Sequence, residues 1–455
     1  MATHLTYRAH LRACLRLGFP LVMSHVAQLS IRLSDAIMLG WYSVEALAAE
    51  VLGGTLFYVL FIIGSGFAWA VMPMVAEAQA SGDETRVRRL ARMGGWLSVL
   101  FACLVLPLML FAAPIFRLLG QDPLLSDLAG DYTSVVGFVL LPALLVMVLK
   151  SYLSALERTQ VVMWVTLAAL PLNVLINYVL IFGQWGAPEL GVRGAAIASL
   201  IVTTASFLAL AIYAARVLPE HALFQRVWRP DWEAFGAVFR LGWPIGITNL
   251  AEVGLFASST MMMGWLGTVP LAAHGIALQI SAITFMVHMG LSNAATVRAG
   301  QAYGTRNLTS LRDGAKVILT LSTLFALLTV VLFLAMPEPM ISVFMHPEEK
   351  DRVSVMAVGV ALLAAAALFQ LADAIQVMAL GLLRGVQDTK APMIIAGLSY
   401  WAVGVPASYW LGFRLGLDGV GVWLGLALGL ALAAVFLLWR FWGFSLRRLD
   451  ETVAP

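Results

Sequence analysis

The stretches Arg16-Leu17-Gly18-Phe19-Pro20 and Arg240-Leu241-Gly242-Trp243-Pro244 differ at one position, and each opens a long apolar run. The offset of 224 residues between them also aligns three further pairs: Gly40 with Gly264, Ala48-Ala49 with Ala272-Ala273, and Gly66 with Gly290. A match that continues without a gap through two successive apolar segments indicates a tandem duplication. In a membrane protein built from two similar halves, we expect a ligand site at the interface between the halves.

The composition is that of a membrane protein. Hydrophobic residues make up 61% of the chain and charged residues 12%, with a mean hydropathy of +0.89, whereas soluble domains carry about 25% charged residues. Because an apolar helix of about 20 residues crosses a bilayer, twelve spans are predicted, at residues 17–40, 51–74, 94–114, 133–155, 161–183, 194–215, 241–265, 271–297, 317–337, 353–383, 392–413 and 419–440. Continuous apolar runs without two-residue alternation exclude a membrane β-barrel. The predicted fold is an all-α membrane protein with twelve transmembrane helices in two pseudo-symmetric six-helix bundles.

The longest interruption between apolar runs, residues 216–239, contains two prolines, two tryptophans and scattered charges. Tryptophan is typical of the headgroup interface of a membrane. We therefore predict an N-terminal six-helix bundle over residues 1–218, a cytoplasmic linker over 219–240 and a C-terminal six-helix bundle over 241–455.

The positive charges predict which helix ends are cytoplasmic, because cytoplasmic loops retain Lys and Arg. With the N-terminus inside, most of the 28 Lys and Arg residues fall on the cytoplasmic side, Arg384 among them. The opposite side carries only Arg117, Arg193, Lys350, Arg352 and Arg414. Arg32 and Lys150 lie within predicted spans. Both termini are thus predicted to be cytoplasmic, and the net charge of +3 reflects topology rather than nucleic-acid binding.

The motifs of soluble enzymes are missing from the sequence. No Walker sequence, His-Glu-x-x-His or Gly-x-Ser-x-Gly pattern occurs, so we expect no enzyme activity, no ATP site and no cofactor. Cys14 and Cys103 lie at different membrane depths and have no His or Cys at a metal-ligand spacing, so we expect both to be inert. The N-terminus lacks a cleavage-site pattern, and we expect the first span to be retained. Uphill movement of a solute would then require an ion gradient.

Three carboxylates lie within predicted spans: Asp35 in the first, Glu252 in the seventh and Asp373 in the tenth. A charged carboxylate is costly in a bilayer, so such a residue carries a proton, binds a cation or is paired with one. The 224-residue offset aligns Glu252 with Gln28 and Asp35 with Ser259, so the acids were not copied with the fold. We predict cation coupling at all three acids, the alternative being carboxylates that only join helices by hydrogen bonds.

Several short patterns recur in a defined order: Gly18-Phe19-Pro20, Ser34-Asp35-Ala36-Ile37-Met38-Leu39-Gly40, Gly242-Trp243-Pro244, Ala272-Ala273-His274, Asp373-Ala374-Ile375-Gln376, Leu383-Arg384-Gly385 and Asp388-Thr389-Lys390. With them the chain resembles, over nearly its whole length, the multidrug and toxic compound extrusion (MATE) family and its bacterial NorM-like branch. The resemblance implies a cation-coupled antiporter of the bacterial inner (plasma) membrane that expels lipophilic cationic compounds. It also implies a V-shaped cavity between two bundles and functional acids at Asp35, Glu252 and Asp373.

The coupling ion is open between Na⁺ and H⁺. Some NorM-like proteins have a tyrosine one turn before the tenth-span acid, where this chain has Phe369, which lacks a hydroxyl oxygen. If the ion is sodium, Glu252 and Asp373 are the predicted ligands of this monovalent cation, completed by carbonyl, amide or water oxygens. Arg32 lies three residues before Asp35 on the same helical face, and an ion pair between them would hold Asp35 charged.

The substrate cavity is assigned to polar, aromatic and thioether side chains within the spans. The predicted lining residues are Gln28, Asn173, Asn177, Met261, Gln279, Phe285, Phe369 and Gln376. Thioethers repack easily and rings attract cations, which suits flat cationic compounds. Helix packing explains the amides equally well, and contact with lipid is the alternative for any single Met or aromatic residue. We expect Lys150 to snorkel to the cytoplasmic side and His25, His274 and His288 to stay neutral.

The expected mechanism is alternating access, in which cation and substrate favour different states. The predicted partners are lipophilic cationic small molecules and membrane lipid, without nucleic acid, and we expect the protein to function as a monomer. Two other functions stay open. A flippase for lipid-linked precursors would share the fold but needs a cationic cavity for phosphate. An intramembrane enzyme, the more remote alternative, would need a catalytic pair, for which only Glu252 and Asp373 qualify.

Overall fold

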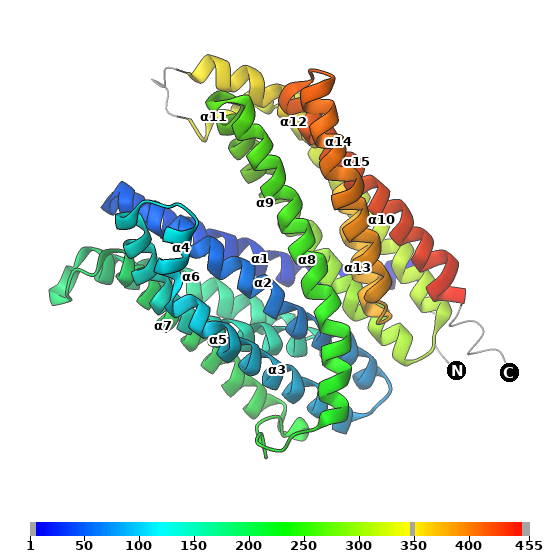
Figure 1. Ribbon diagram of the computed structural model, residues 1–455. Helices are drawn as coiled ribbons and strands as arrows, with labels where there is room; N and C mark the ends of the chain where they lie inside the picture. Colours follow the sequence, from blue (N-terminus) through cyan, green and yellow to red (C-terminus); the bar gives the residue numbers. More distant parts are fainter. Residues whose placement is uncertain (1–5, 346–350, 448–455) are drawn as a thin grey trace. The chain divides into compact units, whose positions relative to one another are not determined.

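The computed structural model describes residues 6–345 and 351–447, and these ranges are almost entirely helical (Figure 1). The long helices are α1 (Tyr7–Tyr42), α2 (Val44–Ala80), α3 (Glu84–Leu110), α5 (Pro123–Ala155), α6 (Thr159–Phe182), α7 (Gly191–Val217), α8 (Trp232–Leu266), α9 (Thr268–Gly304), α10 (Leu308–Ala335), α12 (Arg352–Gly385) and α15 (Asp418–Arg440). One more long helix, residues 390–414, consists of α13 (Lys390–Gly397), the π-helical segment η3 (Leu398–Gly404), α14 (Val405–Tyr409) and the π-helical segment η4 (Trp410–Arg414). The short elements are α4 (Ala112–Leu118), η1 (Gln184–Gly186), η2 (Pro219–His221), α11 (Pro337–Ser342) and η5 (Phe441–Ser445).

Within the described residues, eleven helices are long and apolar enough to cross a membrane. The remaining predicted span, residues 241–265, lies in α8, which is a continuous helix but falls outside this set because Asn249 and Glu252 lower its hydropathy. The predicted all-α membrane fold is confirmed. Lys350, one of the five charges predicted to lie opposite the cytoplasm, is outside the described residues.

The helices form two compact units. Unit 1 contains residues 1–22 and 247–455, and unit 2 contains residues 23–246. The predicted boundaries at 218–219 and 240–241 follow the linker in the sequence, whereas the compact units divide within α1 and α8. The first turns of each of these two helices therefore belong to a different unit from the rest of the helix.

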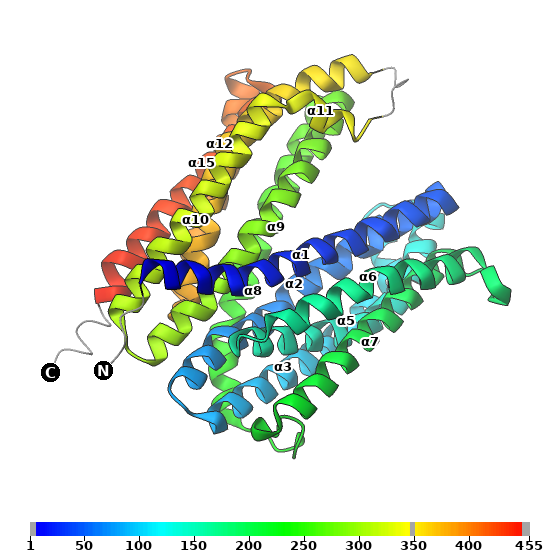
Figure 2. The same cartoon turned by 180° about the vertical axis from the view of Figure 1, so that it is seen from behind.

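Each unit is built around one central helix, as the two views show (Figures 1 and 2). In unit 2, α5 packs against α2, α3 and α7. In unit 1, α12 packs against α9, α10 and α15. Helix α15 approaches residues 398–414 closely through glycines spaced four residues apart: a Cβ at Gly425 would lie 2.2 Å from the backbone nitrogen of Ser408. Small residues at this spacing are typical of close helix packing in membranes.

The repeated Arg-Leu-Gly-x-Pro segment supplies an equivalent contact in both units. In unit 2, a Cβ at Gly66 of α2 would lie 2.5 Å from the carbonyl oxygen of Gly242 and from the nitrogen of Gly246, both in α8. In unit 1, a Cβ at Gly290 of α9 would lie 2.6 Å from the nitrogen of Val22 in α1. The duplication offset relates Gly66 to Gly290 and Val22 to Gly246. Each unit is thus completed by the opening segment of the other half's first helix.

The chain between α7 and α8 is attached to α3 of unit 2. The Arg92 guanidinium donates to the carbonyl oxygens of Ala222 and Leu223 at 2.8 and 2.9 Å, and the Trp96 indole donates to the carbonyl oxygen of Val227 at 2.7 Å. Arg89 forms an ion pair with Asp231, and its guanidinium lowers the pKa of that carboxyl. Because α8 begins at Trp232, the second part of the predicted linker 219–240 is helical.

Candidate functional site

In unit 2, Asp35 of α1 is hydrogen-bonded by amides of α6. The Asn177 amide nitrogen donates to Asp35 Oδ1 at 2.5 Å and also contacts Asn173 Oδ1 at 3.2 Å. The Ser34 hydroxyl donates to the same Asn173 oxygen at 3.3 Å. Asn173 and Asn177 are 0% exposed. In this structure the two buried amides are hydrogen-bonded with each other, and Asn177 with the acid; their place in a substrate cavity stays a prediction.

The charged side chains in this part of unit 2 are Asp35, Glu50 and Arg32. Among the described residues no ion pair joins Arg32 to Asp35, so the alternative of a structural pair is not observed. The Arg32 guanidinium lies over the ring of Tyr58 in α2, 5.4 Å from its centroid. Glu50 of α2 interacts electrostatically with both Asp35 and Arg32, and Tyr132 of α5 with both acids. Unit 2 thus brings together two carboxylates, one guanidinium and one phenol.

In unit 1, Glu252 of α8 and Asp373 of α12 interact electrostatically. Gln370, Asp373 and Gln376 recur every three residues and so share one face of α12. All three side chains on this face are almost fully buried. Within the described residues, four buried side-chain oxygens of this cluster have no hydrogen-bond partner: Glu252 Oε1, Gln370 Oε1, Asp373 Oδ1 and Gln376 Oε1. Buried polar atoms are rarely left without a hydrogen-bond partner, so these oxygens are candidate ligands for a cation.

Tyr400 supplies the hydroxyl group that Phe369 lacks. It lies in the π-helical segment η3, is fully buried, and its oxygen accepts a hydrogen bond from the Gln376 amide at 2.5 Å. Tyr400 also interacts electrostatically with Glu252 and Asp373. π-helical turns occur frequently at functional sites because they alter the side-chain register locally. The cluster in unit 1 therefore contains a phenol from a helix in which the sequence predicted no site residue.

Arg384 adds a cation to the same region. It is 8% exposed, although its sequence position predicted a cytoplasmic helix end, and its guanidinium donates to Asn249 Oδ1 at 2.9 Å. Asn249 precedes Glu252 by one turn of α8, and Arg384 interacts electrostatically with Glu252. Arg384 lies in the last turn of α12, at the helix end that the sequence predicted, and the fold buries it within unit 1 near Asn249 and Glu252.

His274 is held neutral by its neighbours. The Trp423 indole, which can only donate, donates to His274 Nδ1 at 3.0 Å, so that nitrogen carries no proton. The other ring nitrogen is then the donor to the Thr260 hydroxyl, 3.1 Å away. The rings of Phe256, Phe369 and Trp423 pack edge to face in sequence. Phe369 thus belongs to an aromatic wall next to the acids.

The other predicted cavity residues are spread over both units. Met261 is 63% exposed and Gln279 is also exposed, both on unit 1. Phe285 in unit 1 and Gln28 in unit 2 are half-buried. Their assignment to a substrate cavity stays a prediction. Lys150 is half-buried in α5 and interacts electrostatically with His25.

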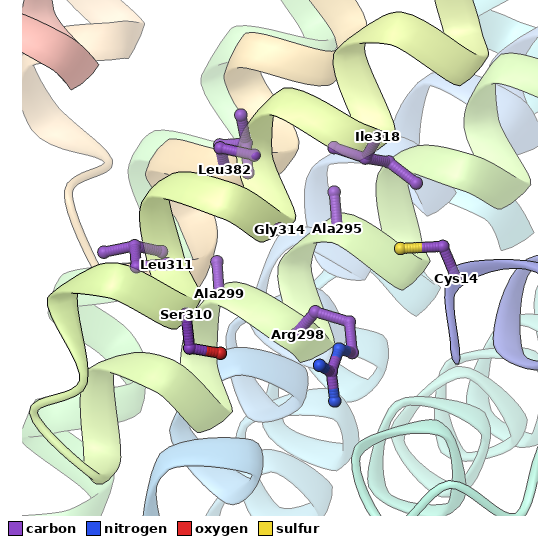
Figure 3. A pocket seen from close by; sticks show the side chains of 10 residues that line it. Cys14, Ala295, Arg298, Ala299, Ser310, Leu311, Gly314, Ile318 and Leu382 are labelled. Carbon is purple, nitrogen blue, oxygen red and sulfur yellow. The ribbon is translucent and has the colours of Figure 1, made fainter. Parts of the chain in front are cut away.

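A small cavity of about 10 Å³ lies in unit 1, lined by residues of α1, α9, α10 and α12 (Figure 3). Cys14 and Arg298 face it, together with small and aliphatic side chains. None of the predicted acids lines it. This volume is about that of one water probe, too small for an organic substrate.

Sequence reasoning missed four members of the two clusters: Glu50, Gln370, Arg384 and Tyr400. Glu50 and Arg384 were assigned to helix ends because their predicted spans were drawn too short, as the structure extends α2 to Val44 and α12 to Gly385. Gln370 precedes Asp373 by three residues and was detectable from that spacing. No sequence signal distinguishes Tyr400 from the other aromatic residues of its helix.

The interiors of both helical units contain acids, amides and a guanidinium. Such ionisable groups within membrane helices are typical of transporters that cross the membrane many times. The comparisons identify the family within that class. The MatE family model matches residues 20–179 and 244–410, two stretches that begin at positions related by the duplication offset. The chain therefore belongs to the MatE family, whose members are transporters and not enzymes.

Curated relatives are similar over almost their full length. A probable multidrug resistance protein NorM of Rhizobium meliloti is 44% identical over 452 residues, covering 99% of this chain and 96% of the relative. The multidrug resistance protein NorM of Burkholderia vietnamiensis is 32% identical over 428 residues, covering 94% and 92%. These relatives agree with the NorM-like resemblance of the sequence patterns.

Solved structures show the same fold. The eukaryotic MATE transporter AtDTX14 superposes with a TM-score of 0.85 at 17% identity, covering 98% of this chain and 100% of that chain. A multidrug resistance MATE family transporter of the MOP superfamily, in an outward-facing conformation, superposes with a TM-score of 0.86 at 20% identity, covering 98% and 97%. At these identities the likeness concerns the fold alone.

Proposed function

We propose that the protein is a cation-coupled multidrug antiporter that exports lipophilic cationic compounds by alternating access. The observation that carries the proposal is the set of four buried, unpartnered oxygens around Glu252 and Asp373. Buried oxygens that receive no hydrogen bond from a protein donor are suited to a cation that enters and leaves. The names of the relatives, multidrug resistance proteins, support small-molecule drugs as the exported compounds.

The charge of the buried clusters supports cationic rather than anionic cargo. Unit 2 contributes Asp35 and Glu50 against Arg32 and the half-buried Lys150, and unit 1 contributes Glu252 and Asp373 against Arg384, which leaves an excess of one acid. A flippase for lipid-linked phosphates would need the opposite balance. The few charges and many aromatic and thioether side chains favour broad recognition of flat cations by contact rather than by matched hydrogen bonds.

The donor set in unit 1 favours sodium as one coupling ion. Carboxylate and amide oxygens are hard ligands, and Na⁺ needs several of them, whereas a proton needs only one carboxylate. Tyr400 offers a further oxygen in place of the missing tyrosine at Phe369. Within the described residues there is no group of three or more His, Cys, Asp or Glu side chains suited to a multivalent metal ion. Asp35, held by amides alone, is the group we assign to protons.

Coupling requires that the cation and the drug stabilise different states, since a ligand with equal affinity for both states shifts nothing. Binding of an external cation to Glu252 and Asp373 would favour the state that releases drug outward. The reverse step would follow when the cation dissociates toward the cytoplasm. The protein is predicted to complete this cycle as a monomer with both termini in the cytoplasm.

The proposal is tested by efflux of a fluorescent cationic dye from proteoliposomes under an imposed Na⁺ gradient or an imposed pH gradient. We expect the Na⁺ gradient to accelerate dye movement, and empty liposomes to show no such effect. The proposal would be overturned if neither gradient changed the rate of dye movement although the protein elutes as a single folded species in detergent. Lipid-linked cargo would then be the function to test next.

Replacing Tyr400 with phenylalanine is expected to weaken sodium coupling about tenfold, because loss of one hydrogen-bonding group typically costs about 0.5–1.5 kcal/mol. The Gln376 amide would lose its acceptor as well. The measurement is the Na⁺ concentration that gives half-maximal dye efflux. Tyr409→Phe is the matched control, since Tyr409 lies on the same long helix but is exposed and stacks on Phe413. Equal effects of the two substitutions would contradict a role for the Tyr400 hydroxyl.

A further inference from the structure

Arg384 is closer to Glu252 than to Asp373. Its guanidinium reaches Asn249, one turn of α8 from Glu252, and interacts electrostatically with Glu252. Arg384 follows Asp373 by eleven residues, which is three turns of the same helix and about 16 Å along its axis. Glu252 interacts electrostatically with both Arg384 and Asp373. Glu252 is therefore the acid that interacts with the guanidinium, whereas Asp373 interacts with Glu252.

Asp388 and Arg298, two other charged residues near this end of α12, have hydrogen-bond partners of their own. Asp388 accepts a hydrogen bond from the Arg440 guanidinium at 2.8 Å. Arg298 of α9 donates to Gln301 and contacts His10. His274 is held neutral by the Trp423 indole. Among the described residues, Glu252, Asp373 and Arg384 are the charged side chains that interact within the cluster, and together they carry one excess negative charge when both acids are ionised.

Resting on the proposed function, we infer that Arg384 is the resident counter-charge of Glu252, so that the cluster takes up one monovalent cation in each cycle. Removing one partner of a buried charge pair leaves an uncompensated charge, which is strongly unfavourable. An ionised Glu252 beside Arg384 meets this requirement without an external ion. Asp373 is the carboxylate that is left to the transported cation.

This role differs from that of a residue that only joins α12 to α8. A packing residue would affect the amount of folded protein and the rate of transport, but not the number of cations exchanged for each drug molecule. Loss of the Arg384 charge alone would leave two uncompensated carboxylates, and the cluster would then take up two cations. Loss of Glu252 alone would leave a neutral cluster that takes up none.

The experiment measures the coupling ratio in proteoliposomes with tetraphenylphosphonium as the drug and with the membrane potential clamped at zero. Net flux of tetraphenylphosphonium stops when its gradient balances the imposed Na⁺ or proton gradient. For a tenfold cation gradient, native protein and Arg384→Lys are expected to balance about a tenfold drug gradient, and Arg384→Gln about a hundredfold gradient. Glu252→Gln is expected to lose the dependence on the cation gradient. Glu252→Gln combined with Arg384→Gln is expected to regain about a tenfold balance.

A tenfold balance for Arg384→Gln would overturn the inference. If that variant does not fold, the comparison between Glu252→Gln and the double variant decides: recovery of coupling in the double variant supports the counter-charge role, and its absence overturns it. If native protein shows no cation dependence, the proposed function itself fails. The two failures are therefore distinguishable.

Discussion

Replacing Gly66 with alanine is expected to abolish folded protein, and Gly290→Ala is expected to do the same. The new Cβ at either position would lie 2.5–2.6 Å from backbone atoms of the facing helix, which cannot move aside as a flexible side chain would. Overpacking of a core typically costs about 1–3 kcal/mol, and a clash with backbone on both sides places these substitutions at or above the upper end. The measurement is the yield and melting temperature of a fluorescent fusion in detergent, followed by size-exclusion chromatography.

Gly275 provides the matched control for both glycines. It lies in α9 like Gly290, and a Cβ there would meet no atom within 4 Å. Gly275→Ala is therefore expected to leave yield and melting temperature unchanged or slightly raised, because alanine is favoured over glycine within helices. Gly66→Ala protein as stable as Gly275→Ala protein would show that α2 and α8 do not approach as closely as described.

Asp373→Asn is expected to abolish cation-driven dye efflux, with a loss of about hundredfold or more under a sodium gradient. Asparagine keeps the size of the side chain but removes the charge, and a neutral amide cannot replace a carboxylate as the counter-charge of a buried cation. Glu252→Gln is expected to have a similar effect on sodium-driven efflux. Asp35→Asn is expected to spare sodium-driven efflux and to reduce efflux driven by a proton gradient.

A surface acid controls for the substitution itself. Asp127 of α5 is exposed and pairs with Arg117 of α4, so Asp127→Asn is expected to leave efflux unchanged. The assignment of Na⁺ to unit 1 and of protons to unit 2 depends on which substitution stops which kind of efflux. If Asp35→Asn stopped sodium-driven efflux while Asp373→Asn did not, the coupling site would have to be moved from unit 1 to unit 2.

The fold was predictable from the sequence because a bilayer of fixed thickness requires an apolar run of about 20 residues to cross it as a helix. Eleven of the twelve predicted segments coincide with helices that qualify as membrane spans, and even α8 is a single helix over the predicted segment. The ends were less predictable, because helices continue past the apolar run wherever polar residues find partners. Glu50 and Arg384, which lie just beyond the ends of the predicted spans, are therefore within α2 and in the last turn of α12.

The acids were predictable and their neighbours were not. A carboxylate within an apolar run is conspicuous in the sequence, whereas Tyr400 resembles the other aromatic residues of its helix. Its hydrogen bond with Gln376 is visible only in the structure. The Asn173 and Asn177 amides were nominated for a cavity, but their contact with Asp35 depends on how α1 meets α6. Side-chain partners across helices are long-range contacts, which a sequence pattern does not encode.

The exchange of opening segments between the repeated halves suggests how such a protein could have arisen. Before fusion, an ancestral six-helix chain with the same contact would have formed a dimer in which each copy packs the first turns of its first helix into the other copy. An obligate dimer of this kind depends on the concentration of its partner, and joining the two genes removes that dependence. Once joined, the two copies were free to diverge, which is consistent with acids at Asp35 and Glu252 that have no counterpart at the equivalent position of the other repeat.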